Sequence, residues 1–216
     1  MIIVVTGPSA AGKSTWCLRH FPEHTVPEYV PSGEDMPGPS PAEQAAFWCE
    51  VNTRRWLQAE HQERRSGLAV CDDDPLKLHY AWSLARIGEL SWRHWQAEID
   101  VHRRAVADGK LGFADLILVS TPTEEELRRR RDADPVRRRR NFDLHVRLIE
   151  PLRQWYQAVE RVGAAQVLWG LPTAGLPAKL PPPKDNRCDI DVYDAVLAAL
   201  PRLPATTESE TLRSKS

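Results

Sequence analysis

The chain has 216 residues, 42% of them hydrophobic, and a formal net charge of −1 at pH 7. This length suits one domain with a real core, and the balanced charge gives no field that would favour nucleic acid or an acidic membrane surface. No apolar run is long enough to cross a membrane as a helix, and the four cysteines lack CxxC or metal-ligand spacing, so we expect a cytoplasmic protein with reduced thiols.

The first expected element is a strand, because residues 2–6 form a short apolar run. The run leads into Gly-Pro-Ser-Ala-Ala-Gly-Lys-Ser at 7–14, a phosphate-binding loop of the pattern GxxxxGK[ST], and then into a helix expected over 14–20. A strand, a glycine-rich turn and a helix start in this order aim backbone N–H groups at an anion. The residues expected to bind the nucleotide are Gly7, Ser9, Ala10, Ala11, Gly12, Lys13, Ser14 and Thr15.

Two side chains of this loop carry the charge and metal chemistry. Lys13 can reach the β- and γ-phosphates of a nucleoside triphosphate, and the Ser14 hydroxyl can hold Mg²⁺. We therefore expect ATP and Mg²⁺ as cofactors.

Further apolar runs predict strands around 24–30 and at 68–71, 115–119 and 166–169. Helical patterns separate these runs. The alternation predicts an α/β protein with the three-layer P-loop NTPase fold: a five-stranded parallel sheet with helices on both faces. We expect one domain over residues 1–203 and a disordered polar tail at 204–216.

Capping signals mark two helix starts. Ser40 with Glu43 opens a helix that runs to about residue 66, and Thr121 with Glu124 opens a helix to about residue 131. A longer helix follows to about residue 162, and we expect Pro151 to kink it.

The helices of residues 40–66 and 75–108 are the expected acceptor side of the site. Trp48 lies on the apolar stripe of the first, and Asn52 is the polar exception on that stripe, so it either bonds the core or faces a substrate. Tyr80, in the aromatic-rich second segment, is a candidate for contact with a planar ligand.

Carboxylates follow two of the predicted strands. Asp72 comes directly after the third strand, where open parallel sheets bind ligands, and is our candidate for positioning Mg²⁺. Glu28 ends the second strand, and Asp74 lies close behind Asp72. Either Glu28 or Asp74 could accept a proton from an acceptor hydroxyl.

Two arginine runs, 128–131 and 137–140, flank a break in the helical pattern and suggest a lid over about 128–141. A helix cannot point successive side chains one way, so only one or two arginines per run can face phosphates. The alternative interpretation of these arginines as an RNA-binding patch is disfavoured, because the runs have no interleaved aromatic residues and the chain has no basic net charge. The lid candidates are Arg128, Arg131, Arg137 and Arg140.

These segments resemble the nucleoside and nucleotide kinases, above all deoxynucleoside kinases and ribosylnicotinamide kinases, over about residues 2–170. The matching motifs are GPSAAGKST at 7–15, VPEYV at 26–30, AVCDDDP at 69–75 and STPTEEELRRRRDADPVRRRRNF at 120–142. The resemblance implies that Glu28 is the base and that Asp72 is the acid after the third strand. It also implies transfer of the ATP γ-phosphoryl group to a small, nucleoside-like hydroxyl acceptor.

The sequence departs from that pattern in two places. Asp72-Asp73 stands where deoxynucleoside kinases have a Glu-Arg pair, and it is closer to the Asp-Thr-Asp of ribosylnicotinamide kinases. The base-reading glutamine of deoxynucleoside kinases has no clear counterpart, since Trp48 falls near its place and Gln44 lies one turn away.

Alternative functions therefore stay open. An antibiotic or natural-product phosphotransferase on the same scaffold, such as one resembling chloramphenicol phosphotransferase, uses the same chemistry. A regulatory nucleotide-binding switch has no acceptor, and a polynucleotide-end kinase is disfavoured by the net charge. A homodimer also stays open.

Overall fold

The computed structural model describes residues 1–32, 35–133 and 142–203. Its centre is a five-stranded, wholly parallel sheet in the order β2-β3-β1-β4-β5. The strands are β1 Ile2–Thr6, β2 Thr25–Val26, β3 Ala69–Asp72, β4 Leu116–Val119 and β5 Gln166–Trp169. The helices are α1 Lys13–His20, α2 Pro41–Ser66, α3 Leu78–Arg86, α4 Trp92–Ala107, α5 Glu124–Asp132, α6 Phe142–Arg147, α7 Ile149–Val162 and α8 Ile190–Ala199.

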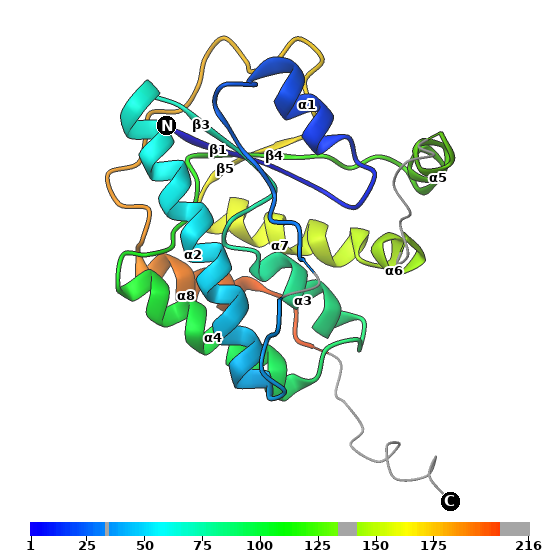
Figure 1. Ribbon diagram of the computed structural model, residues 1–216, viewed down its shortest axis with the longest axis vertical. Coiled ribbons are helices and arrows are strands. Elements are labelled where there is room, and N and C mark those ends of the chain that lie inside the picture. The colour runs from blue at the N-terminus through cyan, green and yellow to red at the C-terminus, as the bar shows by residue number, and fades with distance from the viewer. Residues whose placement is uncertain (33–34, 134–141, 204–216) are drawn as a thin grey trace, which may run out of the picture.

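The sheet separates two apolar layers, as strand alternation requires. Ile3 and Val5 of β1 pack with Trp16 and Cys17 of α1 on one face. Residues of the opposite parity, such as Val4, pack into the larger core that α2, α3, α4, α7 and α8 cover. Figure 1 shows α1 on one side of the sheet and α4 and α8 on the other. The predicted three-layer α/β fold is confirmed.

The second strand is shorter than predicted, at Thr25–Val26 rather than about 24–30. Pro27 follows it and has no N–H to donate to a ladder, which ends the pairing on this edge strand. Glu28 therefore lies in the loop after β2 rather than at the end of a long strand.

The structure places two helix starts at positions that differ from the predicted ones. The capping box of α5 is formed by Thr123 and Glu126 rather than by Thr121 and Glu124, which places Glu124–Glu126 in the first turn at the positive end of the helix dipole. The long helix expected up to residue 162 is two helices that break at Leu148. Pro151 lies in the first turn of α7, where its missing N–H costs least, so the chain is interrupted before Pro151 instead of being kinked there.

The Ser40–Glu43 capping box is present as predicted. Helix α8 has no counterpart among the predicted elements. Residues 134–141 of the expected lid and the expected tail at 204–216 lie outside the described residues. No helix in the described ranges is long and apolar enough to span a membrane.

Asp115 ties the start of the sheet to the long connection before α8. One oxygen of this buried carboxylate accepts from the Ile2 N–H at 2.7 Å, and the other accepts from the Lys184 N–H at 2.8 Å. The Arg187 guanidinium donates to both oxygens and also pairs with Glu63 at 2.6 Å. The charge of Asp115 is therefore fully hydrogen-bonded, as a buried charge must be.

Replacing Asp115 by alanine should destabilise the fold by about 3 kcal/mol or more, because Arg187 then loses a partner in a site that is largely dry. Urea unfolding measures this loss. Asp194→Ala is the matched control, since Asp194 forms an exposed pair with Arg103 that should contribute little. Equal unfolding midpoints for the two variants would contradict the structural role of Asp115.

Candidate functional site

The loop between β1 and α1 has the backbone that a phosphate cradle needs. Gly7 has φ +149° and Gly12 has φ +87°, values that glycine tolerates and side-chain-bearing residues rarely adopt. Gly12 is the N-cap of α1 and brings no side-chain cap, so the N–H groups of the first turn remain available to an anion. Lys13 Nζ donates to Gly7 O at 2.9 Å and Pro8 O at 3.3 Å, which keeps the ammonium over the loop.

The end of β4 holds this loop from behind. A Cβ on Gly7 would lie 2.7 Å from Ser120 O, so only glycine fits there. Ser120 Oγ donates to Ala11 O at 3.0 Å. The cradle is therefore braced against a second strand end.

One arginine of the first run reaches the loop, and it is Arg130. Its Nη1 donates to Ala11 O at 3.0 Å. Arg128 instead pairs with Glu124 at 2.7 Å, and the guanidinium of Arg131 lies 4.5 Å from the ring centre of Phe142. Neither Arg128 nor Arg131 is among the described residues that line the cavity at this site.

A signal for Arg130 was present in the sequence. Leu127 is buried against Ala11, and Arg130, one turn later, lies on the same face of α5. Arg137 and Arg140 lie outside the described residues.

A cavity of about 1050 Å³ extends from the loop to the helices on the other face of the sheet. All of the residues predicted to bind the nucleotide line it, and so do Glu28, Trp48, Asn52 and Tyr80. Asp72 and Asp74 do not line it within the described chain. The lining residues to which the sequence assigned no role in the site include Arg55, Asp73, Lys77, His79, His94 and Glu98.

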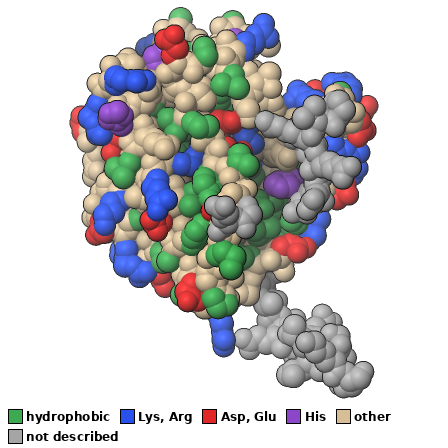
Figure 2. All heavy atoms as spheres, viewed as in Figure 1, with side chains coloured by type: hydrophobic (Ala, Val, Ile, Leu, Met, Phe, Trp, Pro, Cys, Tyr) green, Lys and Arg blue, Asp and Glu red, His purple; other side chains and the backbone are tan. Residues whose placement is uncertain are grey.

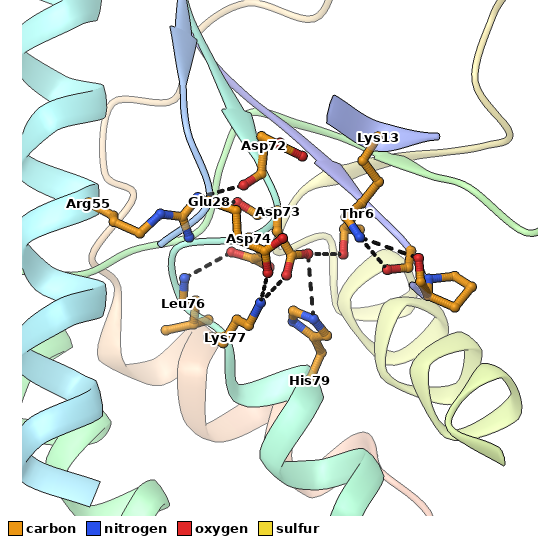
Figure 3. A network of polar contacts seen from close by, with 12 residues as sticks. Thr6, Lys13, Glu28, Arg55, Asp72, Asp73, Asp74, Leu76, Lys77 and His79 are labelled. Atoms are coloured by element: carbon orange, nitrogen blue, oxygen red, sulfur yellow. Dashed lines mark hydrogen bonds and ion pairs between the residues drawn. The ribbon is translucent and has the colours of Figure 1, made fainter. Parts of the chain in front are cut away.

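The three consecutive aspartates separate, and Asp73 is the one that enters the cavity (Figure 3). Thr6 Oγ1 donates to Asp73 Oδ1 at 2.8 Å, and Lys77 Nζ is ion-paired with Oδ2. Lys77 Nζ also donates to Glu28 Oε1 at 2.7 Å. Although burial alone would raise the pKa of Asp73, the positive charges of Lys77 and Lys13 hold it well below its usual range.

Backbone strain is concentrated at the same place. The non-glycine residues of the described chain with positive φ are Ala10 at +68°, Asp73 at +68° and Lys77 at +53°. Each lines the cavity. Such conformations cost about 1–3 kcal/mol each and cluster at functional sites, so they support this cavity as the site.

Arg55 of α2 fixes the strand ends that carry these carboxylates. Its guanidinium is buried and donates to Pro27 O at 3.1 Å, Asp72 O at 2.7 Å and Asp73 O at 2.9 Å. The loops after β2 and β3 are thereby held together, which keeps Glu28 beside Asp73.

Asp74 points into the core instead of the cavity. Its carboxylate accepts from Leu76 N at 3.0 Å and from the Tyr156 hydroxyl at 3.1 Å. Burial raises the pKa of Asp74 to about 6. Of the two carboxylates predicted from the sequence for the acceptor hydroxyl, Glu28 lines the cavity and Asp74 does not.

Asp72 is two residues after Val70 in β3, so its side chain lies on the same face of the sheet as that of Val70, the face that α1 covers. Burial raises the pKa of the Cys17 thiol on α1, and the charge of Asp72 adds to that rise, which places the carboxylate near this helix. Its Oδ1 is buried and has no hydrogen-bond partner among the residues that the structure describes. An orphaned carboxylate oxygen on this side suits a cation held close to α1, whose first turn carries Ser14.

Asp74→Asn should change the pH dependence of stability. A carboxyl whose pKa rises on folding stabilises the protein at low pH and loses that contribution as pH rises through about 6. The variant cannot ionise at this position. The difference in free energy of unfolding between variant and parent should therefore shift in favour of the variant as pH rises from 4 to 7, and stay constant above pH 7. Urea unfolding across this range tests it, with the exposed Asp108→Asn as control. A constant difference across the range would contradict the burial of a titrating Asp74.

No protein-family model and no curated protein matches the chain. Similar solved structures include deoxyadenosine kinase from M. mycoides with bound dATP, at 14% identity and TM-score 0.55 over 78% of this chain and 90% of that chain. The same kinase with the products dCMP and a flexible dCDP bound gives 13% identity and TM-score 0.54 over 92% and 97%. At this identity the likeness shows the fold alone.

Proposed function

We propose that this protein is an ATP-dependent phosphotransferase that moves the γ-phosphoryl group to a hydroxyl of a small, nucleoside-like acceptor. The observation that carries the proposal is that one cavity joins the phosphate cradle to the Glu28–Lys77–Asp73 cluster. A cradle alone would serve a nucleotide switch, whereas a carboxylate facing the same space gives an acceptor hydroxyl a partner. Kinases of the same fold, bound to dATP or to dCMP and dCDP, agree with this chemistry.

The donor side is assigned to the loop and Arg130. The N–H groups of the loop and the Lys13 ammonium bind the β- and γ-phosphates, and Arg130 adds positive charge where the γ-phosphoryl group moves. Ser14 and Asp72 would hold Mg²⁺, directly or through water. The ion would neutralise charge on the phosphates. Within the described ranges no cluster of His, Cys, Asp and Glu could hold a metal by itself, which suits an ion bound by one or two carboxylates and by substrate phosphates.

The acceptor side is assigned to Glu28. Lys77 holds Glu28 Oε1, and the second carboxylate oxygen can take the proton of the acceptor hydroxyl. The acceptor oxygen then bonds to the γ-phosphorus while the bond to the bridging oxygen breaks and ADP leaves. Lys77 acts as a positioning residue, because it fixes Glu28 relative to Asp73.

Lys13→Ala should lower turnover by on the order of a hundredfold or more, since it removes a preorganised contact to the phosphates. Arg130→Ala should lower kcat by on the order of 10³-fold, as expected of an arginine on a transferring phosphoryl group. ATP consumption with nucleosides, nicotinamide riboside and hydroxylated antibiotics measures both. The neighbouring Arg129 is exposed and does not line the cavity, so Arg129→Ala is the matched control. Parent-like turnover of both the Lys13 and Arg130 variants would refute the assignment, and acceptor-independent hydrolysis alone would favour the switch.

Glu28→Gln preserves the shape of the side chain but removes its basicity. Loss of a general base lowers kcat by about 10²–10⁴-fold, while KM for ATP should stay close to that of the parent because the carboxylate does not contact the cradle. Steady-state kinetics with the acceptor that proves active separates the two effects. A variant with normal kcat and a raised KM for ATP would place Glu28 on the donor side instead.

A further inference from the structure

Glu98 is a buried carboxylate in the cavity that no part of the proposed reaction uses. It lies on α4, is 7% exposed and lines the cavity together with Asn52 of α2. No hydrogen bond to its carboxylate is formed within the described chain. The nearest basic atoms are His102 Nδ1 at 3.4 Å from Oε2 and His94 Nε2 at 3.6 Å from Oε1, which are long for hydrogen bonds.

The two histidines do not neutralise this carboxylate. Burial lowers the pKa of His102 to about 4, and it also lowers that of His94, so both rings are neutral at pH 7. Burial raises the pKa of Glu98 to about 7. With a pKa near 7 this side chain is partly protonated at pH 7, and an N–H donor that reaches it favours the ionised carboxylate, which accepts the hydrogen bond.

Asn52, on the same wall, presents a second acceptor, its Oδ1, in an orientation that His102 fixes. His102 Nδ1 lies 2.8 Å from the carbonyl oxygen of Glu98 and must carry a proton to donate to it. His102 Nε2 is then an acceptor, and Asn52 Nδ2 donates to it at 3.1 Å. This orientation uses the amide nitrogen of Asn52 on His102 and leaves Oδ1 without a partner in the described chain.

The wall formed by Glu98 and Asn52 thus presents oxygen acceptors within a cavity that has Trp48 and Tyr80 along its sides. Acceptors without a protein partner in a ligand cavity favour ligands that bring donors over ligands that lack them. Building on the proposed function, we infer that the acceptor carries an amino group, on a ring edge or as an amine, whose N–H groups bind Glu98 and Asn52 while its hydroxyl faces Glu28.

The test compares ligands that differ by one amino group, using titration calorimetry in the presence of Mg²⁺ and a non-hydrolysable ATP analogue. The pairs are guanosine and inosine, adenosine and purine riboside, and glucosamine and glucose, so that ring amino groups and an aliphatic amine form separate arms. In at least one pair, the amino-bearing member should bind the parent protein about tenfold more tightly or better, the ratio that one satisfied buried acceptor provides.

Glu98→Met removes the oxygen acceptors at similar side-chain length and should reduce this ratio toward one. Asn52→Ala serves as a second variant should Glu98→Met fold poorly. Asp100→Asn, an exposed position on the same helix, should keep the parent ratio. Equal binding within every pair, binding of none of the six ligands, or a Glu98→Met variant with the parent ratio would each overturn the inference.

The outcome is distinguishable from failure of the proposed function. If the protein binds the ATP analogue and transfers phosphate equally to both members of a pair, the amino group has no role but the phosphotransferase stands. If the parent does not bind the ATP analogue, and Lys13→Ala changes nothing, the function itself is wrong.

Discussion

The buried charge of Asp73 is the constraint on which the site depends. A carboxylate that is 3% exposed must be neutralised and hydrogen-bonded, or it would ionise only at great cost. Thr6 at the end of β1 supplies a hydroxyl, and Lys77 at the start of α3 supplies a cation. Lys77 is long enough to reach Glu28 as well, so neutralising Asp73 also positions the carboxylate after β2.

The parallel sheet makes this arrangement possible. With β1 between β3 and β4, the phosphate cradle after β1 lies between the acids after β3 and Ser120 after β4. The hydrogen bonds from Thr6 to Asp73 and from Ser120 to Ala11 each join β1, or the loop after it, to the end of a neighbouring strand. Arg55 also binds the loop after β2 through Pro27 O, and Arg130 connects α5 to the loop after β1 through Ala11 O. The proposed donor and acceptor sides share one cavity because the same strand ends support both.

Figure 2 shows side chains of both signs scattered over the visible face. The cytoplasmic location and the homodimer stay predictions.

The sequence was sufficient for the strand–loop–helix order around residues 7–14 and for the parallel sheet, because both follow from local patterns. GxxxxGK[ST] between an apolar run and a helix admits few structures, and the apolar runs alternate with helices at regular intervals. The capping box of Ser40 and Glu43 is similarly local. Where two overlapping boxes were available, as at Thr121 and Thr123, the sequence could not choose between them.

The choice among Asp72, Asp73 and Asp74 could not be made from sequence. It depends on where β3 ends and on the positive φ of Asp73, and aspartate tolerates that conformation at any of the three positions. Glu98 was missed for a different reason. The register of α4 within the segment 75–108 is set by packing on α2 and α3, so a glutamate in a charged helix could not be assigned to a buried face.

The most direct test of the account is ³¹P NMR of the protein with Mg²⁺, ATP and each acceptor in turn. The account predicts that the γ-phosphate resonance of ATP is lost while ADP and a new phosphomonoester resonance grow together, only when a suitable acceptor is present. Inorganic phosphate as the sole product with every acceptor, or an unchanged ATP spectrum throughout, would contradict it.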